Sequence, residues 1–407
     1  MASVISCTEL LSGPARGVRP LASDDRPVVV WNSTRRCNLA CRHCYLRAGE
    51  PAADDGRPEL TAAEAAAFVE DLAAMGAPVL LVSGGEPLLR PDIFSLGDLA
   101  VARGLRAALS TNGTLIDGPT ARRIARAGFS YVGVSLDGLE PTHDRFRGAD
   151  GAFRAALEGI RRCLAAGVRA GVRMTLTRDN FAELPAVLEL VEREAIPRLC
   201  LYHLVYSGRG AELAGRDLSA AESRAAMELV ARSALDWHRR GVAVEVLTVD
   251  NHADGIFMEG IFRGQRSGAG QPGRHDEPGE TGDGAASEPP RRERRHGGCS
   301  AGRRLACVDH LGDVRPCQFW SAAVLGNVRE RPFSRIWADG SHPLLARLRA
   351  MPAPLSGPRC SACRHRELCG GCRVRAEAAG GDPWGDDPAC YLSDAEIGLG
   401  APEAARR

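Results

Sequence analysis

Residues 28–45 read VVVWNSTRRCNLACRHCY, and this stretch decides how the rest of the chain is interpreted. The apolar, β-branched run at 28–32 predicts a buried strand. Three cysteines follow it with the spacing C-x3-C-x2-C, so we expect Cys37, Cys41 and Cys44 to converge on one loop at the carboxyl end of that strand. Thiolates hold iron–sulfur clusters. A four-iron cluster that takes only three thiolates keeps one iron open for chemistry, as a catalytic zinc keeps one open position.

The alternative for this cysteine triad is a structural zinc site. Such sites use four ligands, and the segment offers a fourth only in His43. Its side chain lies between two of the cysteines on a tight loop, which disfavours a joint site. We therefore interpret the triad as a cluster site.

Composition limits the classes of protein to consider. The chain of 407 residues has 52 Lys and Arg against 51 Asp and Glu, which argues against binding nucleic acid through bulk charge. No apolar run reaches the roughly 18 residues of a membrane helix, and the N-terminus lacks the pattern of a signal peptide. We expect a cytoplasmic protein, in which 14 cysteines suit metal or cluster ligation better than disulfides.

From about residue 27 to 247 the chain alternates short apolar runs with amphipathic helical stretches. One helix is predicted at 61–76, with Thr61 and Glu64 as a capping box and Gly76 as its stop. About six such strand–helix repeats predict a parallel sheet with helical crossovers, which places chemistry at the carboxyl ends of its strands. Strands are predicted at 28–32, 78–83, 105–110, 129–138, 168–177 and 197–206.

The remainder divides into a linker and a cysteine-rich module. Residues 263–298 contain no Val, Ile, Leu, Met, aromatic or Cys residue, so we expect a disordered linker that cannot offset its ordering entropy. Residues 299–395 have few helical signals and many cysteines, which is typical of a module that folds around metal or clusters. The predicted units are an N-terminal segment 1–26, a core 27–262, the linker, the module and a tail 396–407.

Four motifs along the core resemble the radical S-adenosylmethionine (SAM) superfamily. They are CNLACRHCY at 37–45, SGGEP at 83–87, STNG at 110–113 and SLDG at 135–138. The resemblance implies a partial (β/α)6 barrel whose open cluster iron chelates SAM. It also implies reductive cleavage of SAM to a 5′-deoxyadenosyl radical, which abstracts hydrogen from a substrate carbon.

The same resemblance assigns the residues around SAM. Gly84 and Gly85 would let the backbone approach the ligand closely, and Glu86 would meet its ammonium group. Asn112, Ser135 and Asp137 would hydrogen-bond its ribose or methionine part, and Arg173 would reach its carboxylate. The alternative for each is a turn residue that satisfies its own loop.

The cysteine-rich module resembles the SPASM extension of radical SAM enzymes, which carries auxiliary four-iron clusters. The resemblance implies one full cluster on Cys360, Cys363, Cys369 and Cys390. A second would bind Cys299, Cys317 and Cys372, with Cys307 either its fourth ligand or, as we favour, a buried strand residue. Two C-x2-C pairs also fit a zinc-ribbon site, so metal and acid-labile sulfide analysis would decide between them.

YHLVYSGRG at 202–210 and TVDNHADG at 248–255 resemble the haem-biosynthesis branch of SPASM proteins, nearest the haem d1 subgroup. That implies 12,18-didecarboxysiroheme as the substrate and loss of its propionate side chains. A sister group removes acetate side chains to give iron-coproporphyrin III, and another relative decarboxylates that compound to haem. Two departures stand out, since the haem d1 pattern reads PDQFW and CGGN where this chain has PCQFW and CGGC.

A tetrapyrrole is a flat iron macrocycle edged with carboxylates. Arg209 is suited to grip a carboxylate, while His203, His252 and His310 can ligate iron or donate to a carboxylate. The alternative for each histidine is a structural hydrogen bond. The family also implies a low-potential electron donor such as flavodoxin or ferredoxin.

Two other functions remain open. A peptide-modifying SPASM maturase would need a peptide-docking module, for which residues 1–26 are too short. A non-catalytic cluster carrier would not need the SAM motifs around its first cluster. We expect neither nucleic acid nor membrane among the partners.

Overall fold

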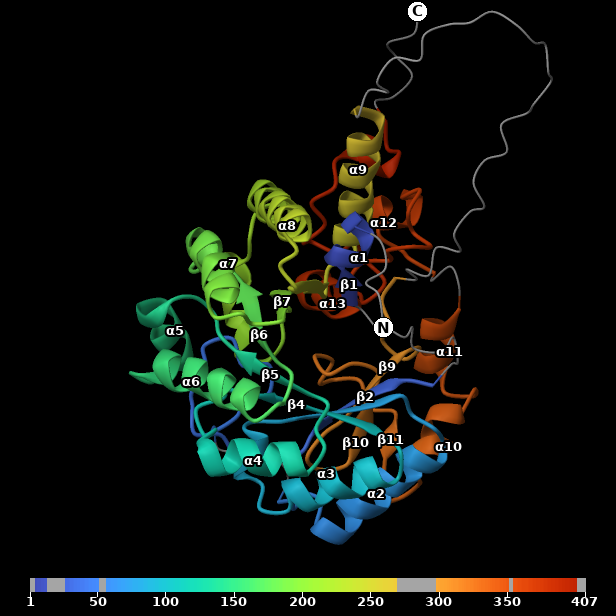
Figure 1. The fold of residues 1–407 in the computed structure, drawn as a ribbon. Helices are drawn as coiled ribbons and strands as arrows, with labels where there is room; N and C mark the ends of the chain where they lie inside the picture. Colours follow the sequence, from blue (N-terminus) through green and yellow to red (C-terminus); the bar gives the residue numbers. More distant parts are fainter. Residues whose placement is uncertain (1–3, 13–25, 51–55, 269–297, 351–353, 401–407) are drawn as a thin grey trace, which may run out of the picture.

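The computed structural model describes residues 4–12, 26–50, 56–268, 298–350 and 354–400 (Figure 1). An eleven-stranded sheet runs through them in the order β1-β8-β7-β6-β5-β4-β3-β2-β9-β10-β11. Its middle, from β2 to β8, is parallel throughout. The first and last strands of this order do not pair, so the sheet stays an open, partial barrel, as the sequence predicts.

The six predicted strands all form, and β8 adds a seventh. The parallel strands are β2 (Val28–Asn32), β3 (Val79–Ser83), β4 (Arg106–Thr111), β5 (Tyr131–Ser135), β6 (Ala170–Leu176), β7 (Arg198–His203) and β8 (Glu245–Val249). The helices between them are α2 (Ala62–Ala74), α3 (Ile93–Ala102), α4 (Gly118–Arg126), α5 (Glu140–Arg147), α6 (Ala152–Ala165), α7 (Leu184–Arg193) and α8 (Ala220–Arg240). They lie on the outer face of the sheet in Figure 1.

Helix α2 illustrates how the sequence sets these elements. Thr61 and Glu64 form the predicted capping box, and Gly76, with φ +74°, lies just beyond the helix end. The buried face includes Phe68, whose ring packs edge-on against Trp31 of β2 at 5.9 Å between centroids. The amphipathic pattern therefore becomes the helix–sheet core.

The predicted N-terminal segment and the predicted start of the linker both contain regular structure. Strand β1 (Val4–Ser6) pairs antiparallel with β8, and α1 (Cys7–Ser12) follows it directly. Helix α9 (Ala253–Gly268) continues past residue 262, over residues 263–268 of the predicted linker. Residues 269–297 of the predicted linker lie outside the described residues.

The carboxyl-terminal module extends the same sheet. Strand β9 (Leu305–Val308) runs parallel to β2, and β10 (Asp313–Arg315) and β11 (Gly326–Asn327) follow antiparallel. The helices of the module are α10 (Phe333–Ala338), α11 (Pro343–Arg349), α12 (Pro358–Ala362), α13 (Arg373–Gly380) and α14 (Asp394–Ile397). Phe333 packs against Phe68 at 6.2 Å between ring centroids, so the module and the barrel share one hydrophobic core.

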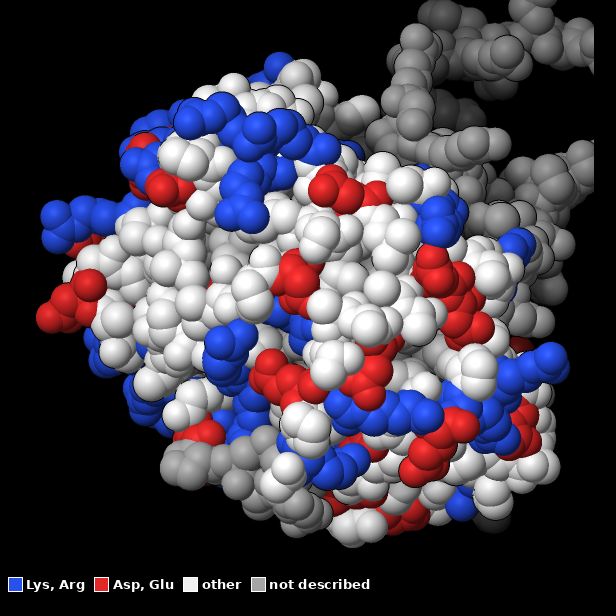
Figure 2. Space-filling view, turned by 90° about the horizontal axis from the view of Figure 1, so that it is seen from below, with Lys and Arg blue, Asp and Glu red and all other residues white. Residues whose placement is uncertain are grey.

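The surface carries both signs of charge. Figure 2 shows positive and negative side chains interspersed over much of one face. Among the described residues, no helix has the length and apolar character needed to cross a membrane.

Candidate active site

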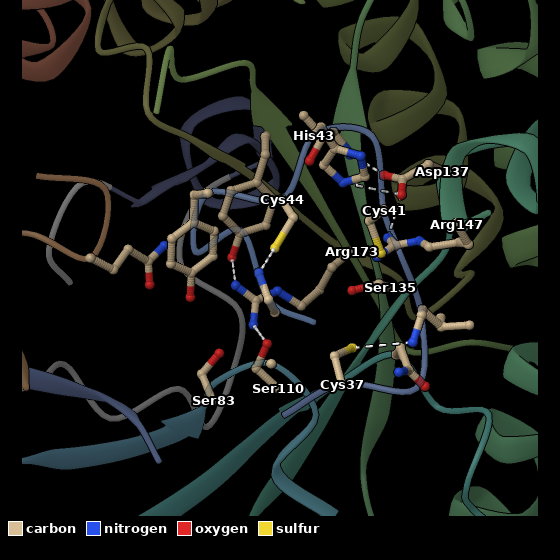
Figure 3. Close-up of a pocket in the computed structure, with 18 of the residues that line it drawn as sticks. Cys37, Cys41, His43, Cys44, Ser83, Ser110, Ser135, Asp137, Arg147 and Arg173 are labelled. Carbon is tan, nitrogen blue, oxygen red and sulfur yellow. Dashed lines mark hydrogen bonds and ion pairs between the residues drawn. The ribbon is translucent and has the colours of Figure 1, made fainter. Parts of the chain in front are cut away.

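A cavity of about 1020 Å³, open to solvent, lies at the carboxyl ends of the parallel strands. It brings together ten residues that the sequence singles out, nine of them from five separate motifs and Arg173 from a predicted strand. These are Cys37, Cys41, Cys44, Gly84, Gly85, Asn112, Ser135, Asp137, Arg173 and His203. Figure 3 shows Cys37, Cys41 and Cys44 grouped around the Arg173 side chain, with Ser83 and Ser110 toward its guanidinium end.

The three cysteine sulfurs each accept a hydrogen bond from the protein. Cys37 Sγ lies 3.4 Å from the Leu39 amide nitrogen, and Cys44 Sγ lies 3.4 Å from that of Ala48. Cys41 Sγ lies 3.4 Å from Arg147 Nη1. Burial raises the pKa of Cys37 to about 11 and also raises that of Cys41. Bound iron would supply the positive charge that makes the thiolate form favourable.

The donor set fits a cluster better than zinc. Within the described residues, no group of three His, Cys, Asp or Glu side chains is arranged to hold a single metal ion, and a four-iron cluster spaces its thiolates more widely than one ion does. His43 does not join the triad, because its Nε2 lies 3.5 Å from Asp137 Oδ2 and its ring packs against Phe146 at 5.5 Å between centroids. The three thiols are therefore suited to three corners of a four-iron cluster.

Asp137 is occupied by the protein itself. Its carboxylate is 1% exposed and accepts hydrogen bonds from Arg147 and, at 2.8 Å, from the Thr175 amide. Burial alone would raise the pKa of Asp137, but the positive charge of Arg147 holds it below its usual value. In this arrangement Asp137 positions Arg147 against Cys41, while still lining the cavity.

The turn formed by Gly84, Gly85 and Glu86 differs in one respect from the expectation that Glu86 meets the ammonium group of SAM. Gly84 and Gly85 line the cavity, but Glu86 is fully buried and is not among the lining residues. Its carboxylate accepts hydrogen bonds from Thr111 Oγ1 at 2.8 Å and the Asn112 amide at 2.8 Å. Glu86 therefore ties the end of β3 to the end of β4.

The two glycines allow this turn to pack against the cluster loop. A Cβ on Gly84 would lie 2.6 Å from the Thr34 carbonyl oxygen, and one on Gly85 would lie 2.2 Å from that of Arg36. Real Cβ atoms do not approach so closely, so a larger residue would push the turn away from the triad.

Arg173 lies in the centre of the cavity wall (Figure 3). It donates hydrogen bonds to Ser110 and to Tyr202, and its guanidinium stands 4.8 Å from the Tyr202 ring centroid. Asn112 also lines the cavity, and its Nδ2 lies 2.9 Å from Asn38 Oδ1 on the cluster loop.

Of the predicted substrate residues, only His203 lines this cavity. Its Nε2 lies 3.0 Å from Asp254 Oδ2, and Asp254 Oδ1 accepts a hydrogen bond from Tyr391 at 2.8 Å. Burial alone would lower the pKa of His203, but the Asp254 carboxylate raises it above its usual value.

Arg209 lies against the outside of the cluster loop instead. Its Nε donates to the Cys41 carbonyl at 2.7 Å, and its Nη1 lies 2.6 Å from Glu50 Oε1. His252 and His310 are buried elsewhere, and neither lines the cavity. The motif spacing could not predict this, because it does not show which way a side chain points after a strand ends.

A second cavity contains the first predicted auxiliary set. The four cysteines that line it are Cys360, Cys363, Cys369 and Cys390. Cys307 lies on β9, fully buried, and its sulfur accepts a hydrogen bond from Asn32 Nδ2 at 3.4 Å. It is thus the buried strand residue that we favour.

The remaining three cysteines gather apart from that cavity. Cys317 and Cys372 belong to a small buried cluster, and Cys299 packs against it. Burial raises the pKa values of Cys317 and Cys372, and the charge of Cys299 adds to both rises. The two predicted auxiliary sets are therefore spatially distinct.

Sequence reasoning missed several residues of the active site. Arg147 comes from α5, a short and mainly polar helix, and Tyr202 is one of two tyrosines on a predicted strand. Gln318 and Phe319 reach the cavity from the carboxyl-terminal module. Their place directly after Cys317 is the one signal that could have identified them.

Comparison with known proteins agrees with this geometry. The family profile described as "Radical SAM superfamily" matches residues 31–191, and that of SPASM, an "Iron-sulfur cluster-binding domain", matches residues 299–372. The chain is 44% identical to the Fe-coproporphyrin III synthase of Methanosarcina barkeri, over 93% of this chain and 90% of that protein. It is 42% identical to the pre-heme d1 synthase of Dinoroseobacter shibae, over 92% of this chain and 88% of that protein.

A solved structure shares the fold. Streptococcus suis SuiB bound to S-adenosylmethionine superimposes with a TM-score of 0.67, at 18% identity, over 90% of this chain and 78% of that one.

Proposed function

The chain belongs to the radical SAM enzymes that carry a SPASM iron–sulfur domain, and we propose that it removes side chains from an iron tetrapyrrole in haem biosynthesis. The observation that carries this proposal is the meeting of the cysteine triad in one cavity with His203, whose ring is bonded to the buried Asp254 behind it. Sequence identities of 44% and 42% to two haem-pathway synthases, along nearly the whole chain, support the proposal.

The residues around the triad have separate tasks in this proposal. A four-iron cluster with SAM bound supplies the carbon-centred radical that removes hydrogen from the substrate. The thiolates of Cys37, Cys41 and Cys44 would hold three irons, and the backbone of Gly84 and Gly85 would bind the methionine part of SAM. The cavity wall that includes Asn112, Ser135 and Arg173 orients the remainder of SAM and limits the access of water.

His203 is the proposed substrate residue. Its bond to Asp254 fixes the Nε2 side of the ring and leaves Nδ1 for the iron or a carboxylate of the macrocycle. Metal-binding histidines commonly have such a carboxylate partner, which orients the ring and raises its basicity. Arg209 is assigned to the cluster loop rather than to the substrate, because its donors already bind Cys41 and Glu50.

We propose 12,18-didecarboxysiroheme as the substrate and removal of its acetate side chains, giving iron-coproporphyrin III, as the reaction. Cys317 and Cys372 favour this reaction, because the haem d1 pattern has Asp and Asn in their places. Removal of propionate side chains in haem d1 biosynthesis is the second candidate, supported by the pre-heme d1 synthase at 42% identity.

The decisive experiment is anaerobic incubation with SAM, a strong reductant and 12,18-didecarboxysiroheme. We expect 5′-deoxyadenosine and a tetrapyrrole whose mass shows the loss of acetate side chains. Loss of propionate side chains would instead support the haem d1 reaction. The triple variant C37A/C41A/C44A is the control and should form neither product.

Two results would contradict the proposal. Consumption of SAM with crosslinking of an added peptide, and none of the tetrapyrrole, would point to a peptide maturase. Absence of 5′-deoxyadenosine from fully reconstituted protein would point to a cluster carrier.

A further inference from the structure

The site formed by Cys299, Cys317 and Cys372 has three thiols for a cluster of four irons. Cys307 does not complete it, because this residue lies within β9 and its sulfur is bonded to Asn32. The fourth iron must therefore take a ligand other than a cysteine of this chain, or stay open to substrate. The residues that lie near the three thiols indicate which of these possibilities applies.

Asp250 is an unusual residue in that neighbourhood. It follows the end of β8, is only 7% exposed, and has a φ of +71°, in the left-handed region that non-glycine residues seldom adopt. Its Oδ2 is buried and has no hydrogen-bond partner in the described structure. A buried carboxylate oxygen on a strained backbone, without a donor, is costly unless it has a ligand to bind.

The Asp250 carboxylate acts electrostatically on two of these thiols. Burial raises the pKa of Cys317 well above its usual value, and the negative charges of Asp250, Cys299 and Cys372 add to the rise. Burial raises the pKa of Cys372 to about 12, with Cys299 and Asp250 again contributing. Charge effects of this kind weaken with distance, so the carboxylate lies near the Cys317 and Cys372 thiols.

The backbone of Asp250 is also fixed to the segment that carries Cys372. Arg375, in the first turn of α13, donates from Nη2 to the Asp250 carbonyl at 2.6 Å and from Nη1 to the Leu204 carbonyl at 3.1 Å. Cys372 is the N-cap residue of the same helix. One arginine thus holds the end of β8 beside the thiol.

We propose that the Asp250 carboxylate is the fourth protein ligand of the cluster bound by Cys299, Cys317 and Cys372. The inference rests on the proposed function only in requiring an auxiliary cluster at these thiols. On binding, the carboxylate is deprotonated, one oxygen bonds to the fourth iron, and the cluster is closed to the substrate. The hard oxygen ligand makes this site chemically distinct from the all-thiolate set at Cys360, Cys363, Cys369 and Cys390.

His252 is the competing ligand, because both of its ring nitrogens are buried without a hydrogen-bond partner. The charges that act on its pKa are those of Arg375, Asp387, Asp254 and Arg373. Asp250 is preferred because its backbone is tied through Arg375 to the helix that Cys372 caps, and because its charge acts on the Cys317 and Cys372 thiols. The H252Q variant tests the alternative directly.

The test uses the full chain in a C37A/C41A/C44A background, where only the auxiliary clusters remain. D250A, D250C, H252Q and C317A are prepared in this background and reconstituted anaerobically with iron and sulfide. Each is reduced and examined by electron paramagnetic resonance (EPR), with and without added imidazole. Neither SAM nor tetrapyrrole is present, so the result is independent of the substrate assignment.

We expect D250A to expose an open iron, so that imidazole changes its EPR spectrum but not that of the parent or H252Q. D250C should keep the parent's iron content and resist imidazole, because a thiolate again closes the site. The proposal is overturned if imidazole changes the parent spectrum as it does that of D250A. It is also overturned if H252Q, and not D250A, gains the response, or if C317A loses no iron.

Discussion

Arg375 and Asp387 form a two-pronged ion pair inside the protein, with Nε 2.8 Å from Oδ1 and Nη2 2.8 Å from Oδ2. Their side chains are 0% and 2% exposed. Asp387 also accepts a hydrogen bond from the Cys372 amide at 2.7 Å, while Arg375 reaches the carbonyls that follow β7 and β8. The pair therefore joins the carboxyl-terminal module to the barrel.

Replacing Arg375 by methionine should destabilise the protein strongly. The change leaves Asp387 as an unpaired buried charge, which typically costs about 3–5 kcal/mol. R335M, at an exposed arginine of α10, is the matched control and should change stability by less than about 0.5 kcal/mol. Thermal unfolding of reconstituted protein measures both. Equal melting temperatures for the two variants would contradict the structural role given to the pair.

Arg147 should set the reduction potential of the cluster at the triad. Its charge-assisted hydrogen bond to Cys41 favours the more negative, reduced cluster, and such a bond contributes about 1.5–3 kcal/mol. Only the part of this energy that differs between the reduced and oxidised clusters shifts the potential, so R147A should lower it by at most about 60–130 mV, since about 1.4 kcal/mol corresponds to 59 mV for one electron. An EPR-monitored redox titration measures this shift. R145A removes an exposed arginine from the same helix and should leave the potential unchanged.

Asp254 should control the affinity for the tetrapyrrole through His203. Loss of such a carboxylate partner typically weakens metal binding about 10–100-fold, and D254N should weaken substrate binding by a similar factor. The absorption spectrum of the added iron tetrapyrrole reports the binding. Y391F keeps the carboxylate and should bind within about threefold of the parent. Unchanged affinity in D254N would remove His203 from the substrate site.

Glu86 should make stability depend on pH. Burial raises the pKa of its carboxyl from 4.5 to about 7. Between these values the folded protein keeps a proton that the unfolded chain releases, so stability falls as the pH rises through this window and is level above it. The whole effect is on the order of 3 kcal/mol.

The comparison of E86Q with the parent isolates this carboxyl. Gln does not titrate, so the melting temperature of E86Q should fall less than that of the parent between pH 5 and 7. E70Q, at an exposed glutamate that pairs with Arg103, should follow the parent. A parent and E86Q with parallel pH profiles would show that Glu86 is not protonated in the folded state near neutral pH.

The sequence predicts well the strands and helices that have a regular pattern of apolar residues. Strand β2 has the predicted bounds 28–32, and the capping box at Thr61 forms, because both depend on short-range patterns. The convergence of the triad with the later motifs also follows from pattern, since all carboxyl ends of a parallel sheet meet at one edge.

Side-chain direction and long-range pairing were beyond such reasoning. Arg209 and Glu86 both lie near the cavity, yet each is turned toward backbone groups of distant loops. Helix α9 continues past residue 262, into a stretch whose composition gives no helical signal. The hydrogen-bond partners of Arg209 and Glu86 come from segments far away in the sequence, which no local pattern can reveal.

The pairing of β9 with β2 has a practical consequence for anyone who truncates this protein. A fragment ending at residue 262 would lack β9 and would leave β2 as an unpaired edge strand. The free backbone amide and carbonyl groups of such an edge can pair with a strand of another molecule. Such a fragment is expected to precipitate rather than persist as a minimal enzyme. The cysteine-rich module is thus a lateral wall of the barrel, and the module and the barrel should be expressed as one piece.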